Sequence, residues 1–437
     1  MELWMIAIIL FGSLLLFLFL GIPVSFALGG TSIILGMIYW GGLPSLDGFV
    51  LGSYENVTQA ILTAVPLYIF MAAVLMYSGL AEDLYEVIYR WFGGIRGGLA
   101  AGTSVIAAIF SSMVGVISAS TAALGMVSRP SMLKRGYDDK LTLGVIMAGG
   151  TLGLLIPPSI VMIIYSSESG ESAAALFMAG IVPGFLAATI FIVYSLVLCF
   201  INPEKGPKID FEERYTWGEK FRSLRGVILP LVVIVIVLGS IYFGVATPTE
   251  AGAVGGVGAL CAAGTKKKLN LENIKSIFLM TARLTGMVFW ILIGAAAYAR
   301  IVAVTGVGDG LAAMISESDY NRWIVLILIL VLFLIFGMFM DSVAVLLITA
   351  PFFLPLLTAL DFDLIWFGVL FIITVCIGSL TPPVGLSLFI MKGVAPEISI
   401  GKIYSAVWPF VFLLLLLIVI VLIFPEVAMW LPGMMMD

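Results

Sequence analysis

The chain has 437 residues, of which 62% are hydrophobic and only 11% are charged, and its formal net charge is -5. A soluble domain is about one quarter charged, so this composition requires a largely lipid environment. No basic patch with interleaved aromatics is present, which argues against nucleic-acid binding. The chain has no histidine, which excludes His-based proton relays, His-ligated metals and Ser-His hydrolysis. Cys199, Cys261 and Cys376 are isolated in apolar stretches and predict neither disulfides nor a metal site.

Apolar runs of about 20 residues, long enough to cross the hydrocarbon core, recur along the chain. The N-terminus lacks the basic region and cleavage site of a secretory signal, so the first run is interpreted as a retained span. We predict spans at 3–20, 22–40, 58–80, 138–168, 173–201, 227–245, 247–264, 282–304, 364–392 and 401–425. Segment 81–97 mixes charges and aromatics at helical spacing, which predicts an interfacial helix.

Two further apolar regions, 98–133 and 322–358, are interrupted at their middle by small or polar residues. The interruptions fall at 115–120 in the first region and at 337–342 in the second. Non-helical backbone at membrane depth is tolerated only where protein or a watery cavity surrounds it. We therefore predict two re-entrant hairpins, each of which enters and leaves the membrane on one side.

The basic residues test this arrangement, because Lys and Arg collect on the cytoplasmic side of a membrane. With the N-terminus outside, all of the 21 Lys and Arg except Arg300 and Arg322 fall in segments predicted to be inside. Those segments are 81–97, 129–140, 202–226, 265–283 and 392–402. The predicted outer loops 41–57, 168–172 and 359–363 carry acids and no Lys or Arg. In this orientation both termini are periplasmic, the first hairpin opens inward and the second outward.

The two halves of the chain share landmarks in the same order, about 225 residues apart. The matching pairs are Gly21-Ile-Pro23 with Ala246-Thr-Pro248, Ser78-Gly79 with Thr305-Gly306, Ser120-Thr121 with Asp341-Ser342, Gly153–Pro158 with Gly378–Pro383, and Pro183 with Pro409. Each half has five spans and a hairpin, and an odd number of spans places the second half in the opposite orientation. Inverted repeats with broken helices are typical of secondary transporters, which bind substrate near the midplane.

The predicted fold class is therefore an all-α polytopic membrane protein built from two inverted repeats. Each repeat has five spans, a re-entrant hairpin and a helix broken by prolines. Residues 1–201 form the first repeat, 202–226 a polar cytoplasmic linker, and 227–437 the second repeat.

The Pro157-Pro158 pair breaks the fourth predicted span and leaves nearby carbonyls without helical partners. In lipid this is costly unless something else binds the carbonyls, and Na⁺ prefers oxygen ligands. We predict a first Na⁺ site at this break. Its predicted ligands are Ser118, Ser120, Gly153, Ile156 and Pro158. The alternative is a proline kink satisfied by neighbouring hydroxyls or water. The same pattern at Pro382-Pro383, again beside a hairpin, favours the ion site.

The second repeat contains an ionisable group, Asp341, at its hairpin tip. Such a group deep in a bilayer is costly and by default suggests a function. We predict a second Na⁺ site at this tip. Its predicted ligands are Gly337, Asp341, Ser342, Gly378, Thr381 and Pro383. The alternative role for Asp341 is to cap the following helix, which aspartate does well, and both roles can hold together. Two Na⁺ ions are therefore expected.

A substrate site is expected between these breaks, where helix N-termini freed at the hairpin tips favour carboxylates. The candidate substrate ligands are Ser120, Thr121, Ser159, Thr381 and Arg300. Arg300 lies near the outer end of its span and can instead extend to the interface. Glu250 follows Thr247-Pro248 in a pattern typical of a helix cap. The chain has no nucleotide-binding P-loop, so a gradient or another subunit supplies the energy, and the lack of His favours Na⁺ over protons.

The stretch Ala246-Thr-Pro-Thr-Glu-Ala-Gly-Ala-Val-Gly255 resembles the hallmark of the large membrane subunit of tripartite ATP-independent periplasmic (TRAP) transporters. The motifs at 153–159 and Gly337…Asp341…Pro351 also resemble that family, and the resemblance covers essentially the whole chain. Gly252 is a small departure, where alanine is expected.

The resemblance implies Na⁺-coupled import of an organic acid anion, of the carboxylate or sialic acid class, across a bacterial or archaeal cytoplasmic membrane. It implies two partners, a small four-helix membrane subunit and a soluble periplasmic binding protein that delivers the substrate. It also implies an elevator mechanism, in which 98–201 and 322–425 move against scaffolds at 1–97 and 227–321.

Three alternatives remain at this point. A stand-alone Na⁺/dicarboxylate symporter of similar architecture needs no binding protein. A gated channel conducts without Na⁺ coupling or saturation. A membrane enzyme is disfavoured, because the sequence offers no histidine, metal cluster or nucleophile–base pair.

Overall fold

The computed structural model describes residues 3–208, 215–316 and 320–436, and its regular elements are helices. Backbone groups within a bilayer must be hydrogen-bonded inside their own segment, which favours helices for these long apolar runs. Polar side chains mark several helix starts. The carboxylate of Asp138 accepts from the Leu141 amide, and the hydroxyl of Ser172 accepts from the Ala175 amide.

The first half of the chain contains eleven elements up to the linker. They are α1 (Leu3–Phe19), α2 (Val24–Tyr39), α3 (Ser45–Val57), the 3₁₀ turn η1 (Ala60–Thr63), α4 (Ala64–Tyr77), α5 (Leu80–Phe92), α6 (Gly98–Val114), α7 (Ile117–Lys134), α8 (Asp139–Leu155), α9 (Ile160–Ser169) and α10 (Ala173–Ile201). The linker region contains η2 (Pro203–Lys205) and α11 (Trp217–Ser223).

The second half follows with a similar series. Its elements are α12 (Arg225–Tyr242), α13 (Pro248–Thr265), α14 (Leu271–Thr305), α15 (Val307–Ser316), α16 (Arg322–Phe339), α17 (Ser342–Ala359), α18 (Leu364–Leu380), α19 (Leu386–Val394), α20 (Ile400–Ile423) and α21 (Glu426–Met436). Within the described residues, 8 helical stretches are long and apolar enough to cross a membrane, and four shorter apolar helices accompany them. The polytopic all-α fold is thus confirmed.

Some predicted boundaries were wrong. The predicted outer loop 41–57 contains helix α3, and the predicted span 282–304 is part of α14, which begins at Leu271 and has 35 residues. Asn270 caps that early start, since its side chain accepts from the Asn273 amide. Hydropathy alone missed the first turns of α14, because they carry charged residues such as Lys275. Most of segment 81–97 is helical, as α5, and this helix has one buried apolar face; its place at the membrane interface stays a prediction.

The helix starts repeat between the halves. Helices α6 to α10 begin at residues 98, 117, 139, 160 and 173, and α16 to α20 begin at residues 322, 342, 364, 386 and 400. Gly79 and Gly306, which precede α5 and α15, both have positive φ, at 76° and 66°. In the first half a 3₁₀ turn separates α3 from α4, whereas the single helix α14 spans the corresponding region.

The two broken helices meet at the centre of the molecule. Every residue of α8 from Leu141 to Leu155 is buried, as is every residue of α18 from Ile365 to Leu380. The Sγ of Cys376 on α18 lies 3.4 Å from the Thr151 carbonyl oxygen on α8, and these residues are 225 apart in sequence. This contact brings α8 of the first half of the chain directly against α18 of the second half.

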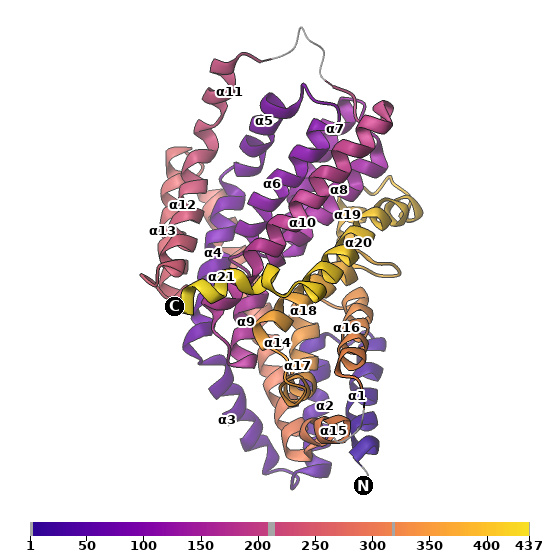
Figure 1. Ribbon diagram of the computed structural model, residues 1–437. Coiled ribbons are helices and arrows are strands. Elements are labelled where there is room, and N and C mark those ends of the chain that lie inside the picture. Colours follow the sequence, from indigo (N-terminus) through magenta and orange to yellow (C-terminus); the bar gives the residue numbers. More distant parts are fainter. Residues whose placement is uncertain (1–2, 209–214, 317–319, 437) are drawn as a thin grey trace.

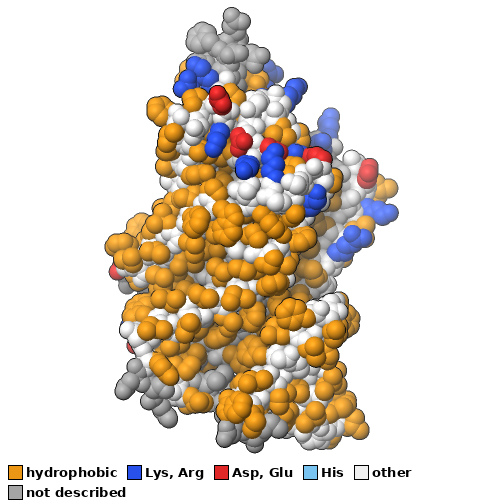
Figure 2. Space-filling view, turned by 90° about the vertical axis from the view of Figure 1, so that its right-hand side faces the viewer, with side chains coloured by type: hydrophobic (Ala, Val, Ile, Leu, Met, Phe, Trp, Pro, Cys, Tyr) orange, Lys and Arg blue, Asp and Glu red, His pale blue; other side chains and the backbone are white. Residues whose placement is uncertain are grey.

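The repeats exchange contacts around this centre. Helix α8 packs on α20 and α18 packs on α10, while α19 packs on α7 and α9 packs on α17. The C-terminal helix α21 lies across α10, between the upper and lower groups of helices in Figure 1. On the face in Figure 2, Lys and Arg gather toward one end, and the rest is a broad hydrophobic surface suited to lipid.

Candidate functional site

Helices α6 and α7 form the first predicted hairpin. Contacts between the start of α6 and the end of α7, at the end away from the tip, show this. The Leu99 amide donates to the Tyr137 hydroxyl at 3.1 Å, and the Thr103 hydroxyl lies 3.5 Å from the Met132 sulfur. The two arms therefore run antiparallel. The turn between them lies at Gly115, whose φ of 63° is readily adopted only by glycine.

Helices α16 and α17 form the second hairpin. The rings of Trp323 and Phe362 lie 5.5 Å apart near the open end, and those of Phe333 and Phe353 lie 5.3 Å apart further along the arms. The turn occupies Met340 and Asp341. Both interruptions predicted from the sequence thus become hairpin tips.

The first broken helix lies directly against the first hairpin. A Cβ added at Gly153 would clash with the carbonyl oxygen of Ser111 on α6. A Cβ added at Gly115, in the turn, would lie 3.3 Å from the Pro158 carbonyl oxygen. The Ser111 hydroxyl donates to the Gly149 carbonyl at 3.1 Å. The first break and the first hairpin therefore touch each other through backbone atoms.

The second broken helix meets the second hairpin in the same way. A Cβ added at Gly378 would lie 2.7 Å from the backbone carbon of Gly337, so α18 and α16 touch through backbone. The Gly385 amide, just after the break, donates to the Met338 carbonyl at 2.7 Å. The Thr381 hydroxyl donates to the Ile377 carbonyl at 2.7 Å. Only residues without bulk permit this approach, which explains the paired glycines.

The two hairpin tips face one cavity of about 30 Å³. It is lined by Gly115, Val116 and Ile117 of the first tip, Asp341, Ser342 and Val343 of the second, Leu154, Ile160 and Val161 beside the first break, Ile69 of α4, and Leu284, Met287 and Val288 of α14. This volume holds about one water molecule. In this conformation the tips are closed upon each other, and α4 and α14 flank them.

Three buried hydroxyls near the first break have no hydrogen-bond partner among the described residues. They belong to Ser120 and Thr121 in the first turns of α7 and to Ser159 before α9, all 0% exposed. An unpaired buried hydroxyl costs about 1–3 kcal/mol, so each needs an explanation. All three were predicted ligands, and an occupant of this region would satisfy them. Ser118 lies half-buried in the first turn of α7.

Asp341 is the N-cap of α17, since its carboxylate accepts from the Val343 amide at 3.0 Å. The capping role predicted as an alternative is therefore confirmed. The Ser342 amide and hydroxyl also lie close to this carboxylate, which has further acceptor positions, so a ligand role stays open. Among the described residues, no group of three or more His, Cys, Asp or Glu could hold a metal ion. The donors offered here are carbonyls, hydroxyls and Asp341.

Other predicted residues lie elsewhere. Arg300 is exposed on α14, with its guanidinium 5.8 Å from the centre of the Trp40 ring. Its described contacts are with Trp40, just after α2, and with Gly52 of α3, and none joins it to the hairpin tips. Glu250 forms a capping box with Thr247, as its sequence pattern predicted.

Sequence reasoning missed several buried hydroxyls that lack a partner among the described residues, including those of Ser387, Tyr68 and Tyr298. Ser387 lies in α19, after the second break. The ring of Tyr68 on α4 lies 6.2 Å from that of Phe177 on α10. The ring of Tyr298 on α14 lies 6.1 Å from that of Phe352 on α17. An isolated tyrosine in an apolar span carries no local signal of its partner, so only the packing reveals these residues.

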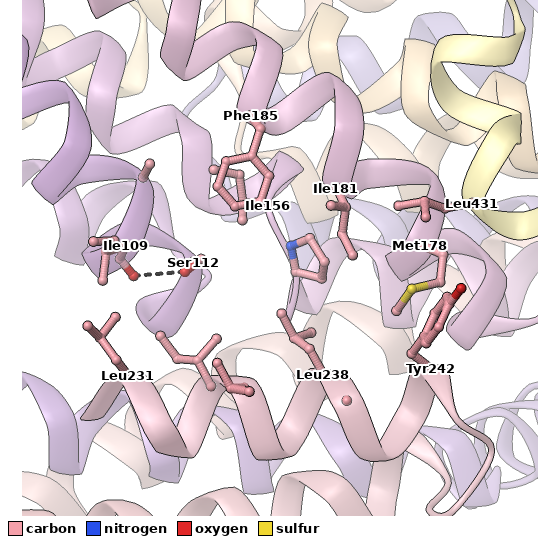
Figure 3. Close-up of a pocket in the computed structure, with 15 residues that line it drawn as sticks. Ile109, Ser112, Ile156, Met178, Ile181, Phe185, Leu231, Leu238, Tyr242 and Leu431 are labelled. Atoms are coloured by element: carbon pink, nitrogen blue, oxygen red, sulfur yellow. Dashed lines mark hydrogen bonds between the residues drawn. The ribbon is translucent and has the colours of Figure 1, made fainter. Parts of the chain in front are cut away.

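A larger crevice, of about 440 Å³, lies between α12 and helices α6 and α10. Figure 3 shows Leu231, Leu238 and Tyr242 of α12 on one wall and Phe185 and Ile181 of α10 among the residues opposite. The Ser112 hydroxyl donates to the Ile109 carbonyl at 2.7 Å and is therefore satisfied. No charged side chain lines this crevice and its walls are apolar apart from the Tyr242 and Ser112 hydroxyls, so its size does not make it the substrate site of an anion.

Ion pairs connect the two halves of the chain near the end of α7, away from the tip of the first hairpin. We call Arg129, Asp139, Glu397 and Lys402 the ionic clasp. The Arg129 guanidinium lies 2.7 Å from Glu397 and 3.5 Å from Asp139, and Lys402 lies 2.7 Å from Asp139. Arg129 and Asp139 are largely buried, at 14% and 18% side-chain exposure, so water screens this part of the clasp little.

The clasp predicts an acid-sensitive contribution to stability. A hydrogen bond from its own backbone amide, then one from Arg129, holds the pKa of the Glu397 carboxyl below its usual value of 4.5, although Asp139 opposes this. Such a carboxyl stabilises the fold above the unfolded-state pKa, and the contribution is lost as pH falls through the folded-state pKa. Between neutral pH and pH below 4.5, the thermal midpoint of Glu397→Gln in detergent should therefore fall less than that of the wild type.

Glu204→Gln is the matched control, since Glu204 is exposed and has no ion pair among the described contacts. It should keep the wild-type acid sensitivity. An identical fall for Glu397→Gln and the wild type would contradict the clasp.

The sequence matches the family described as tripartite ATP-independent periplasmic transporter, DctM component, over residues 11–427. It is 31% identical to the ectoine TRAP transporter large permease TeaC of Halomonas elongata, over 95% of this chain and 96% of that protein. It is 31% identical to the C4-dicarboxylate TRAP transporter large permease DctM of Pseudomonas aeruginosa, over 89% of this chain and 90% of that protein.

A solved structure has the same fold. The crystal structure of the Alcanivorax borkumensis YdaH transporter has a TM-score of 0.66 to this chain at 18% identity, and the match covers 96% of this chain and 98% of that one. These relatives are transport proteins, not enzymes. The protein is therefore a multi-pass inner-membrane protein, and the chain belongs to the DctM family, the large permease component of tripartite ATP-independent periplasmic transporters.

Proposed function

We propose that this permease imports a small organic acid anion by Na⁺ coupling, with Na⁺ held at the two helix breaks. The observation that carries the proposal is the pairing of each proline break with a hairpin tip. At both places glycine backbone lies against backbone, through Gly153 and Ser111 in one repeat and Gly378 and Gly337 in the other. Carbonyls freed from helical hydrogen bonds in lipid need a partner, and a cation supplies one.

The substrate class is supported by the relatives. Their names specify C4-dicarboxylates, ectoine and, for a permease of Oleidesulfovibrio alaskensis that is 29% identical, isethionate. All are small molecules that carry an acidic group. We propose that this chain transports a molecule of the same kind, a carboxylate or sialic acid class anion, beside the unpaired hydroxyls of Ser120, Thr121 and Ser159. Helix N-termini at the hairpin tips favour such a negative charge.

The partners follow from the tripartite family. We propose a periplasmic binding protein that delivers the substrate and a small four-helix membrane subunit. The match covers 97% of this chain but only 66% of the isethionate permease named DctMQ. That relative therefore carries an additional segment. We assign that segment to the small subunit.

Transport is proposed to proceed by an elevator movement of 98–201 and 322–425 against 1–97 and 227–321. The closed tips beside α4 and α14 support this division, because a substrate needs a rearrangement to enter a cavity of about 30 Å³. The gathering of Lys and Arg at one end supports a cytoplasmic assignment of that end, with both termini periplasmic.

Reconstitution tests the proposal. Proteoliposomes with this permease and the small subunit should accumulate the binding protein's ligand only when loaded binding protein and an inward Na⁺ gradient are both present. A K⁺ gradient of the same size is the control. Uptake by the permease alone would instead support a stand-alone symporter, and unsaturable conduction without Na⁺ would support a channel.

A further inference from the structure

We propose that a pocket beside the α5–α6 loop binds an anionic phospholipid, with its phosphate between Arg96 and Lys208. The pocket measures about 620 Å³ and is lined by Gly94, Ile95, Arg96, Leu196, Val197, Phe200 and Lys208. It lies apart from both helix breaks and shares no residue with the cavity at the hairpin tips.

One hydrogen bond brings the two basic residues to the same place. The Gly97 amide donates to the Gly206 carbonyl at 3.0 Å, so the loop that carries Arg96 is fixed to the segment that carries Lys208. A Cβ added at Gly97 would lie 2.7 Å from the Cβ of Cys199, which leaves no room for another side chain behind the loop. The backbone is thus held closely, while the side chains of Arg96 and Lys208 remain exposed.

These two cations have no acidic partner within 4.0 Å among the described residues. Arg90 differs, because Glu86 lies 2.6 Å from its guanidinium. An unpaired arginine beside a lysine suits a phosphate, since a guanidinium offers several donors in a plane and the ammonium adds a second charge. The pocket therefore has the charge complementary to an anionic headgroup.

The apolar walls distinguish a lipid from free phosphate. Ile95, Val197 and Phe200 are 50%, 50% and 76% exposed, and the last two lie on α10, which is apolar enough to cross a membrane. An acyl chain can follow these side chains along α10 while the headgroup stays at the basic end. Basic pockets between membrane helices on the cytoplasmic side bind anionic headgroups in this manner.

The position suggests a consequence, which rests on the proposed elevator. The loop 93–97 joins α5 of the scaffold to α6 of the moving part. The loop and α10 are held together by the Gly97–Gly206 hydrogen bond and the packing on Cys199, so a lipid bound to both would restrain their movement relative to α5. Phosphatidylglycerol should then change the rate of transport relative to phosphatidylcholine in the wild type, but not in a variant that lacks Arg96 and Lys208.

Binding can be measured without transport. Native mass spectrometry of the detergent-solubilised permease should show retention of phosphatidylglycerol in preference to phosphatidylcholine. The double variant Arg96→Gln, Lys208→Gln should lower that preference on the order of tenfold, because each basic residue contributes to the attraction. Lys134→Gln, Lys140→Gln is the matched control, since both lysines are exposed and basic but do not line the pocket.

Two further measurements distinguish a bound lipid from free phosphate. Inorganic phosphate at the lipid concentration should not displace phosphatidylglycerol, and Phe200→Ser should lower retention while both charges remain. Equal retention of the two lipids by the wild type, or an unchanged preference in the Arg96, Lys208 variant, would overturn the proposal. Displacement by inorganic phosphate would overturn the role of the apolar wall. Unchanged thermal midpoints show that the variants are folded.

Discussion

Replacement of Asp341 by asparagine is expected to raise the Na⁺ concentration for half-maximal transport on the order of tenfold, a loss of about 1.4 kcal/mol in binding. The carboxylate caps α17 through the Val343 amide and faces the cavity between the hairpin tips. Asparagine caps helices about as well as aspartate, so the fold should persist. What asparagine removes is the formal charge next to the second break. Uptake at varied Na⁺ in proteoliposomes measures the effect.

The structure supplies matched controls for the capping role. Asp363 caps α18 through the Trp366 amide at 2.8 Å, and Asp138 caps α8 through the Leu141 amide at 2.9 Å. Asp363→Asn and Asp138→Asn should leave the Na⁺ dependence unchanged. If Asp341→Asn behaves like these two variants, Asp341 is a helix cap only and the charged cation site is wrong.

A single methyl group at Gly378 is expected to abolish most transport. The added Cβ would lie 2.7 Å from the backbone carbon of Gly337 and 3.0 Å from the Leu334 carbonyl oxygen, and backbone cannot move aside as a flexible side chain can. Overpacking of this kind costs about 1–3 kcal/mol. Here it also forces α18 away from the second hairpin, so the oxygens of the second site separate. Uptake and the thermal midpoint should both fall.

Gly393→Ala and Gly401→Ala are the controls for this substitution. Both glycines are helical, and an added Cβ would have no neighbour within 4 Å. Alanine in a helix is about 1 kcal/mol more favourable than glycine, so these variants should be as stable as the wild type or more so. Normal transport by Gly378→Ala would show that the close approach of α16 and α18 is not needed.

Much of the fold was predictable because its signals are local. Pro157-Pro158 and Pro382-Pro383 interrupt apolar runs, and the structure ends a helix just before each pair. The polar interruption at Asp341 likewise becomes a hairpin tip with a cap. Backbone satisfaction in lipid leaves few alternatives for such segments, so pattern and structure agree.

The rest depends on contacts between distant segments. Nothing in the sequence near Thr151 shows that it meets Cys376, which lies 225 residues later in the chain. The extent of α14 was missed because its first turns are charged and are supported by the cap at Asn270. The ionic clasp joins Arg129 to Glu397, and a charge in a loop does not indicate its partner. The partners of Tyr68 and Tyr298 likewise could not be predicted, because they lie on distant segments.

The number of Na⁺ ions carried with each substrate tests the account most directly. Two helix breaks, each paired with a hairpin, predict at least two Na⁺ per substrate. The reversal potential of uptake in proteoliposomes, measured at several Na⁺ and substrate gradients, gives this ratio. A ratio of two or more agrees with cation sites at both repeats. A ratio of one, or a reversal potential that does not depend on Na⁺, would contradict the account.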